Sequence, residues 1–534
     1  SQMTSGNSQS SASSQVNAVQ TVNISADTDD QTSSKLSVDQ LESAMTPTAA
    51  LAASEQTATG NSSTATGTTS TSTDTTTEKS IDVDSWDTLN NAIYKGDYTV
   101  INITKDIDAG SSKNRGDRIS AGSVADRDFT INGNGHSINF ADNSYQFKTS
   151  GSTNRTITLK NLTFYSTDSL TSLNPIARYG VFTYDKDQTI TDSNIHHTLV
   201  FDNVNYHGVR LTSSSNGRVI FQGTNQIQIE DSYTYGGETY SSNTTTFGGL
   251  PAVTAGQVIV DSGTTTITDP GDTVIYTKKT SNDTAADGSL TVNNGATLDV
   301  TGSVLTDGTQ HHASWYDPNI IADIYAQGTL KIDGGKVVIH MSPKTKYLKA
   351  GLASDMGNST ADALDITNSG SLDIENEGET SANSNIAVSA GLYVSGNQPV
   401  NVTNGGQLTV NMHKTSTTAS AIGLHDGEFN VQGTGSTVTV NNYNNDSAIH
   451  LQGTSSSSFG EINIQDGGTV TINQHNKTTD GAIGISKNGK VLVNAGGKLT
   501  VNNSIDSSND SSYTNDASIV VGGTGQLQIN SAQV

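Results

Sequence analysis

The chain has 534 residues, a formal net charge of −25 at pH 7, few prolines and no cysteine. The absence of cysteine excludes a disulfide framework and a thiolate metal site, and a field this negative argues against nucleic acid as a natural partner. No apolar run reaches the length of about 18 residues that a membrane-spanning helix needs, so we predict no membrane span in this segment.

Residues 1–80 form a low-complexity segment rich in Ser, Thr, Gln and Ala, with almost no aromatic residues. Such a segment buries too little apolar surface to offset the entropy of ordering it, so we predict disorder, apart from one weak helix at 37–44. Two interpretations stay open: a linker or leader remnant, and a stretch that carries O-linked sugars. Because no charged-then-apolar leader opens the chain, we expect that any signal peptide has been removed.

A short amphipathic helix is predicted over residues 84–96, where the ordered structure begins. Capping residues come first, apolar residues recur at helical spacing, and a glycine ends the segment. We expect residues 81–100 to form an N-terminal cap, because an uncovered first coil of strands exposes its apolar core and an unpaired strand edge. Trp86 is then either a plug in that core or a platform for a sugar ring.

The segments that follow carry the motifs of a known family. After SWDTLNNAI in the helix, the sequence reads VINITKDI, RDFTINGNGHSINF, NRTITLKNLTF and LVFDNVNY. This order closely resembles the pectate-lyase-like adhesive domain of surface proteins from lactobacilli, and it is similar to the binding regions of serine-rich-repeat adhesins. The resemblance covers residues 81 to about 260 in motif detail. It implies a right-handed β-helix, secretion to the cell wall of a Gram-positive bacterium, and adhesion to polysaccharide, mucus components or neighbouring cells.

Arginine and tyrosine are concentrated in the first third of the predicted rod. All seven arginines lie between Arg115 and Arg218, and eight of the 17 tyrosines lie between Tyr145 and Tyr240. Guanidinium groups bind carboxylates through paired hydrogen bonds, and aromatic faces stack on sugar rings, so this surface is predicted to bind an acidic polysaccharide. The alternative is that these side chains only decorate larger loops. The candidate ligand-binding residues here are Arg178, Tyr179, Tyr184, Tyr206, Arg210, Tyr233 and Tyr235.

Two loops interrupt the regular pattern, at 230–250 and at 309–318. Loops on a rigid scaffold commonly carry binding residues. Trp315 and Tyr316 in the second loop are therefore candidates for stacking on a sugar, with packing of the loop onto the coil as the alternative. Two adjacent histidines in the same loop seldom point at one ion, and no third ligand is evident. We predict no metal site and no cofactor.

One pattern repeats nine times between residues 257 and 534: an alternating apolar run, a glycine turn and a second alternating run. The period of about 33 residues indicates stacked units that cannot bury their apolar faces alone. Apolar residues at every second position predict strands, and Gly, Asn and Asp at the corners suit tight bends. We predict an all-β fold, a three-faced parallel β-helix over residues 81–534. The inward residues in register are Val402, Leu408, Val431, Val438, Ile464, Val470, Val493 and Leu499.

An enzyme on this fold needs a specific set of outward side chains. A lyase needs several carboxylates on one face to hold calcium, with a basic residue beside them, and a hydrolase needs paired carboxylates. Most acidic residues here stand at corners, where turn chemistry explains them. The most suggestive group combines Asp202, His207 and Arg210, which can equally be ordinary surface residues. We predict no catalytic residue, and a polysaccharide lyase or hydrolase is the least favoured function.

The favoured prediction is a non-catalytic cell-surface adhesin that binds acidic polysaccharide or the glycans of host or neighbouring cells. The alternative is a self-associating rod that joins cells in aggregates and biofilms, because long rows of Thr, Asn and Gln can pair with an identical face. Unperturbed carboxylates titrate near pH 4, so acidification removes the repulsion between chains of this charge. We therefore expect adhesion to strengthen between about pH 6 and pH 4.5.

Overall fold

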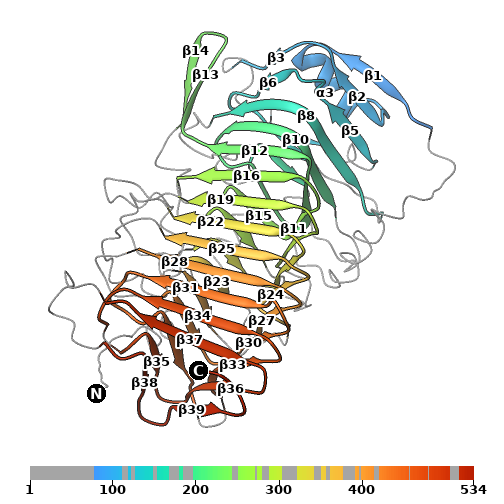
Figure 1. The fold of residues 1–534 in the computed structure, drawn as a ribbon. Coiled ribbons are helices and arrows are strands. Elements are labelled where there is room, and N and C mark those ends of the chain that lie inside the picture. Colours follow the sequence, from blue (N-terminus) through green and yellow to red (C-terminus); the bar gives the residue numbers. More distant parts are fainter. Residues whose placement is uncertain are drawn as a thin grey trace.

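The computed structural model describes residues 77–110, 118–121, 127–147, 153–167, 180–184, 197–242, 251–270, 273–278, 288–302, 322–341, 350–355, 361–376, 391–395, 398–413, 420–455, 458–478, 480–505 and 516–534. In this part of the chain the strands stack coil upon coil into one rod (Figure 1). Each regular coil contributes strands to three parallel ladders, so the predicted three-faced parallel β-helix is confirmed. The Ser/Thr-rich segment through residue 76, with the weak helix predicted at 37–44, lies outside the described residues.

The first ladder runs through the whole rod and contains the strand before each glycine corner. Its register is parallel throughout. Its strands, or the parts of longer strands that join it, are β1 (Ser80–Val83), β2 (Val100–Ile103), β5 (Phe129–Asn132), β8 (Thr156–Ser166), β10 (Thr198–Gly208), β11 (Thr212–Gln222), β15 (Val253–Val260), β18 (Ser289–Val292), β21 (Leu330–Asp333), β24 (Leu364–Thr367), β27 (Val400–Thr403), β30 (Glu428–Gln432), β33 (Gly460–Gln465), β36 (Gly489–Val493) and β39 (Gln526–Ile529).

The second ladder contains the strand after each glycine corner and crosses the front of the rod in Figure 1. The second halves of β8 and β10 belong to it. Its other strands are β3 (Ile107–Asp108), β6 (Ser137–Asn139), β12 (Thr224–Ile229), β16 (Thr264–Asp269), β19 (Thr297–Gly302), β22 (Lys336–Met341), β25 (Ser371–Asn376), β28 (Gln407–Met412), β31 (Thr437–Asn442), β34 (Thr469–Gln474) and β37 (Lys498–Asn503).

The third ladder closes each coil, and the first halves of β11 and β15 belong to it. Its other strands are β4 (Arg118–Ala121), β7 (Ser144–Phe147), β9 (Phe182–Tyr184), β17 (Ile275–Thr277), β20 (Ala322–Ala326), β23 (Ala350–Asp355), β26 (Leu392–Ser395), β29 (Ile422–His425), β32 (Ile449–Gln452), β35 (Ile483–Ile485) and β38 (Ile519–Val521). One antiparallel hairpin, β13 (Ser232–Tyr235) with β14 (Glu238–Ser241), projects from the rod near its N-terminal end (Figure 1).

The core of the rod is a continuous column of inward apolar side chains. Val402, Val431 and Ile464 pair in register on successive coils of the first ladder, and each has 0% of its surface exposed. The other five residues predicted to face inward are also buried, with at most 1% exposed. Strand alternation places their polar neighbours outside, so the predicted inward face is confirmed.

The glycine corners bend the chain in the left-handed region of backbone space. Asp466 and Gly467, at the corner between β33 and β34, have φ of 54° and 92°. Gly adopts such angles without steric cost, and Asp and Asn tolerate them better than other residues do. The next residue, Gly468, is fixed by space, because a Cβ there would lie 2.3 Å from the carbonyl oxygen of Val431 on the preceding coil. The corner sequence therefore follows from the close stacking of the coils.

A single described helix, α3 (Trp86–Tyr94), covers the first coil, as predicted. The side chain of Ser85 accepts a hydrogen bond from the backbone N–H of Thr88, and the side chain of Thr88 accepts one from Ser85 N–H, which completes a capping box. Trp86 is only 4% exposed and its ring stacks on Tyr145 with the centroids 5.4 Å apart. Trp86 is therefore a plug in the core, and the alternative of a sugar platform is wrong because its faces are covered.

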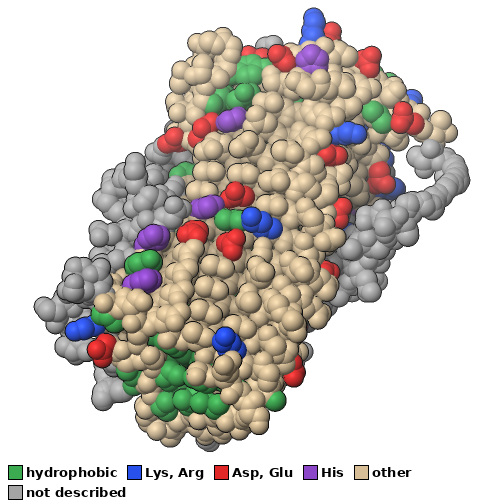
Figure 2. Space-filling model, in the orientation of Figure 1, with side chains coloured by type: hydrophobic (Ala, Val, Ile, Leu, Met, Phe, Trp, Pro, Cys, Tyr) green, Lys and Arg blue, Asp and Glu red, His purple; other side chains and the backbone are tan. Residues whose placement is uncertain are grey.

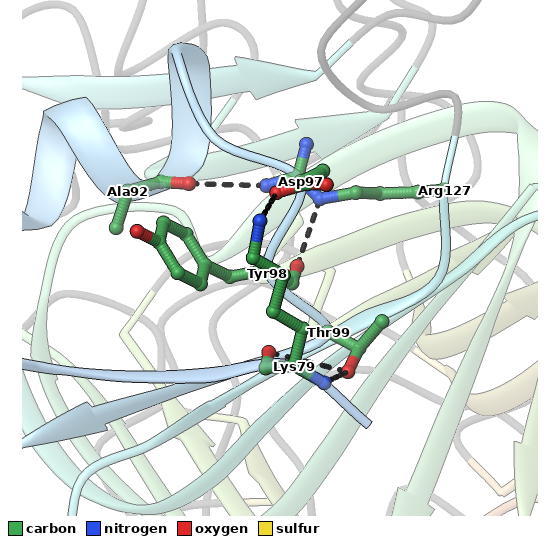
Figure 3. A network of polar contacts seen from close by, with 6 residues as sticks. All are labelled: Lys79, Ala92, Asp97, Tyr98, Thr99 and Arg127. Atoms are coloured by element: carbon green, nitrogen blue, oxygen red, sulfur yellow. Dashed lines mark hydrogen bonds and ion pairs between the residues drawn. The ribbon is translucent and has the colours of Figure 1, made fainter. Parts of the chain in front are cut away.

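Arg127 fastens the C-terminal end of α3 to the first coil (Figure 3). Its guanidinium donates hydrogen bonds to the carbonyl oxygens of Ala92 at 3.2 Å, Ile93 at 3.0 Å and Tyr98 at 2.8 Å. A cation at this end of a helix also complements the helix dipole. Beside it, Lys79 forms an ion pair with Asp97. One arginine thus satisfies carbonyl groups that the end of the helix leaves without partners.

We expect Arg127→Gln to loosen this cap, because the glutamine side chain is shorter and uncharged and cannot reach all three carbonyl oxygens. Charge-assisted hydrogen bonds contribute about 1.5–3 kcal/mol each at most, so we expect a loss of about 2 kcal/mol in the stability of the cap. Faster amide hydrogen exchange in α3 would report it. Lys105→Gln, on an exposed residue of the same coil, is the control. Exchange rates in α3 equal to those of the unsubstituted chain would contradict the role of Arg127.

Candidate functional site

Three of the predicted ligand-binding residues point into the protein. Tyr206 is 0% exposed, and Tyr184 and Arg210 are 1% exposed. The hydroxyl of Tyr206 bonds with Ser166 and with the carbonyl oxygen of Val209. The expectation that these three side chains form an outer binding surface is therefore wrong: their rings and guanidinium fill the interior and its corners.

Three arginines with described side chains, Arg210, Arg218 and Arg127, hold parts of the fold together. The guanidinium of Arg210 donates to the hydroxyl of Thr254, and Arg218, 6% exposed, donates through Nε to Gln257 Oε1 at 2.5 Å. Arg127 holds the cap, as described above. The predicted binding residues Arg178 and Tyr179 lie outside the described residues, and so do Trp315 and Tyr316 with the whole of the 309–318 loop.

The tyrosines of the β13–β14 hairpin form a cluster on the outside of the second ladder. Tyr233 and Tyr240 face each other across the hairpin with ring centroids 5.2 Å apart. The hydroxyl of Tyr233 donates to Asn139 Oδ1 at 2.7 Å, and the hydroxyl of Tyr235 bonds with Ser137 Oγ at 2.8 Å. These contacts fold the hairpin back onto β6, almost a hundred residues earlier. We call residues 232–241 the tyrosine hairpin.

Tyr165 is the residue under the tyrosine hairpin that the sequence prediction missed. Its ring lies 5.2 Å from that of Tyr233 and 5.3 Å from that of Tyr235, centroid to centroid. It also stacks on His207 at 5.4 Å, and His207 Nδ1 lies 3.1 Å from Glu230 Oε1. Tyr165, Tyr235 and His207 are each half-buried, so one side of the cluster is open to solvent.

The cluster combines uncharged tyrosine hydroxyl groups, which donate hydrogen bonds, with nearby carboxylates, which accept them. Burial, and then the neighbouring Glu238, raise the pKa of Tyr240 to about 12. Burial likewise raises the pKa of Tyr235, against the opposing effect of its hydrogen bond to Ser137. Both hydroxyls therefore stay protonated near neutral pH. Aromatic rings, hydroxyl donors and carboxylate acceptors in one place suit the apolar and hydroxyl faces of a sugar.

The group that most suggested catalysis is not brought together. Asp202 lies on the first ladder and accepts a hydrogen bond from Gln222 at 3.0 Å. His207 lies on the second ladder beside Glu230, and Arg210 is buried beyond it. Within the described ranges, no three His, Asp or Glu side chains are grouped closely enough to hold a metal ion. No described helix is long and apolar enough to cross a bilayer.

A second surface feature is an uncharged face on the later coils of the second ladder. Figure 2 shows that the front of β28, β31 and β34 is almost free of charged side chains. Asn411, Asn441 and Asn473 stand in register there. The amide of Asn441 donates to Asn411 Oδ1 at 2.5 Å, and that of Asn473 donates to Asn441 Oδ1 at 2.8 Å. The row of Asn therefore forms an ordered ladder of side chains.

Comparison with known proteins connects the early coils to a family. Residues 80–215 match the family model of a putative pectate lyase-like adhesive domain, so the predicted resemblance of this region is confirmed. Among solved structures, the SRRP of L. reuteri 100-23 is 14% identical, with a TM-score of 0.32 over 86% of this chain and 98% of that one. The SRRP of L. reuteri 53608 is 12% identical, with a TM-score of 0.31 over 84% and 99%. No curated protein matches the chain.

Proposed function

We propose that this chain, whose residues 80–215 match an adhesive domain, is a non-catalytic adhesin displayed on the surface of a Gram-positive bacterium and binds glycans. The observation that carries the proposal is the surface at the tyrosine hairpin, where the half-buried rings of Tyr165 and Tyr235 lie among hydrogen-bonding groups, whereas Tyr233 and Tyr240 are buried. The catalytic alternative has less support, because Asp202, His207 and Arg210 lie on different faces or in the interior.

The charge of the proposed site decides which glycans suit it. Asp106, Glu230 and Glu238 lie close to the tyrosine hairpin and its ladder. Carboxylates repel a uronic-acid polymer at neutral pH. We therefore propose that neutral glycans bind over a wide pH range, whereas acidic polysaccharide binds as the pH falls from about 6 to about 4.5 and the net charge of −25 is reduced.

The test is an array of neutral and uronic-acid oligosaccharides probed with the purified chain at pH 7 and at pH 4.5 at fixed ionic strength. We expect Tyr235→Ala to weaken the strongest neutral signal about tenfold, equivalent to about 1.4 kcal/mol. The matched control is Tyr443→Ala, because the ring of Tyr443 is also reached by solvent but lies on later coils, away from the hairpin. No glycan bound at either pH, or equal loss in both variants, would overturn glycan binding at this site.

A second candidate function is adhesion between cells through association of identical rods. The uncharged face of β28, β31 and β34 favours it, since a chain with a net charge of −25 otherwise repels its own copies. Beads coated with the chain should then clump without added glycan. Clumping that needs a glycan would instead support the first function alone.

A further inference from the structure

The uncharged face has a regular pattern of hydrogen-bonding groups. Thr409, Thr439 and Thr471 stand in register on β28, β31 and β34, and Asn411, Asn441 and Asn473 form the parallel row beside them. We call these six residues the Thr/Asn patch. Neighbouring rungs of such a ladder are about 4.8 Å apart, so the patch repeats the same groups at a fixed spacing along the rod.

Each group of the Thr/Asn patch can both donate and accept toward solvent. An asparagine amide has two N–H groups and a carbonyl oxygen with two lone pairs. The bonds from Asn441 to Asn411 and from Asn473 to Asn441 each use one N–H and one lone pair. One donor and one acceptor per rung are left outward, and the threonine hydroxyls add a further row. Because the ladder already fixes the amides, binding a partner costs little additional entropy to order them.

Only a partner with the same repeat matches every rung of the patch at once. A second copy of this chain offers that repeat, with donors and acceptors that complement its own. We propose that the Thr/Asn patch binds the Thr/Asn patch of a second copy, with the two rods antiparallel and the two-fold axis passing through β31. This inference rests on the second proposed function, association between identical rods, and assigns it a surface and an orientation.

The charges at the two ends of the patch determine the orientation. Asp373 and Glu375 lie outward on β25, one rung before the patch, and Lys498 lies exposed on β37, one rung after it. With the axis at β31, the β37 rung of each copy faces the β25 rung of the other. Lys498 then lies opposite Ser371, two residues along β25 from Asp373, so a long lysine side chain comes close to a carboxylate at both ends. Parallel rods would place Asp373 opposite Asp373 and leave Lys498 without a carboxylate across the interface, which opposes that arrangement.

The expected contact is small and weak. Five rungs, from β25 to β37, extend over only about 20 Å. The surface area that such a contact buries is therefore smaller than the roughly 1,200–2,000 Å² of a standard interface. Single pairs should therefore form transiently, and many pairs between two cell surfaces would bind through avidity. Antiparallel rods suit this role, because rods that project from two opposing cells point in opposite directions where they lie side by side.

Single cysteines test the orientation, since the chain contains no cysteine of its own. In the antiparallel pair, Thr439 faces Thr439, whereas Thr409 faces Thr471. We expect Thr439→Cys to form disulfide dimers under mild oxidation, and a mixture of Thr409→Cys and Thr471→Cys to cross-link at least tenfold faster than either variant alone. Asn463→Cys, outward on the first ladder, is the control. Dimers of Thr409→Cys alone at the same rate as the mixture would show parallel rods and overturn the proposal.

Charge exchange separates this inference from the function on which it rests. Lys498→Asp and Asp373→Lys should each slow the Thr439→Cys cross-link and weaken bead clumping about tenfold, and the double variant should restore both. Beads that clump while Thr439→Cys cross-links no faster than Asn463→Cys would leave association between rods intact and overturn the assigned surface. Beads that never clump, with no cross-link at any position, would overturn both.

Discussion

Val431→Asp is expected to unfold or fray the rod. Val431 is fully buried between Val402 and Ile464 of the neighbouring coils, so the new carboxylate would have no water and no cation within the core. An unpaired buried charge costs several kcal/mol, about 3–5 in measured cases where one partner of a buried pair is removed. That is a large share of the roughly 5–15 kcal/mol by which a typical domain is stable.

Urea unfolding followed by circular dichroism and by limited proteolysis would measure this effect. Coils of a solenoid interact mainly with their neighbours, so we expect new cleavage sites around β30 at urea concentrations that leave the unsubstituted rod intact. Thr434→Asp, at an exposed corner of the same coil, adds the same charge outside and is the control. A soluble Val431→Asp variant with the midpoint of the unsubstituted chain would show that this position does not face inward.

Two ionisable side chains should give the rod opposite responses to acid. Burial, and then the proximity of His425, lower the pKa of His450 to about 4, and its Nε2 lies 2.7 Å from Ser486 Oγ. Burial raises the pKa of Asp365 to about 6, although the hydrogen bond from Asn401 acts in the opposite direction. A neutral histidine and a neutral carboxylic acid are both favoured by the folded state.

The signs follow from proton linkage. The unfolded histidine takes up a proton below its ordinary pKa of 6.5, whereas folded His450 resists it until about pH 4, so stability is lost as the pH falls through that window. Folded Asp365 takes up its proton near pH 6 and the unfolded one near 3.8, so stability is gained over almost the same window. The two effects oppose each other in the unsubstituted chain.

Replacing one of the two side chains should therefore reveal the effect of the other on the pH dependence of stability. Between pH 7 and pH 4.5, His450→Gln should gain about 2.5 kcal/mol relative to the unsubstituted chain. Asp365→Asn should lose about 1 kcal/mol, a smaller value because this carboxylate is partly exposed and screened by solvent. Urea midpoints of the three chains at both pH values measure these differences. Differences that stay constant with pH would contradict the shifted pKa values of both groups.

The fold was predictable because it depends on local patterns. The alternation in β28 or β34 identifies its inward face, and the corner glycines mark where each strand ends, so the inward column of Val431 and its neighbours followed from the sequence. The helix over Trp86 was equally local, since its capping residues and apolar spacing lie within a dozen positions.

In the early coils, local alternation alone did not predict which side chains face inward or where the tyrosine hairpin lies. β10 turns a corner at Asn203, which has a φ of 56°, and the alternation changes phase there. Tyr206 is in phase with Val204 and therefore points inward, a signal that the sequence did contain. The contact of Tyr233 with Asn139 joins residues more than 90 positions apart, and no single sequence shows it. The tyrosine hairpin could thus be located as a loop but not positioned against Tyr165.

The direction of the ladders has a mechanical consequence. The hydrogen bonds between coils run along the length of the rod, so a pull on its two ends loads the coils one after another. Under shear flow, each coil of about 33 residues that peels away would lengthen the chain by about 110 Å. A bacterium tethered by this protein would then stay attached while the chain lengthens in steps and the remaining coils stay folded.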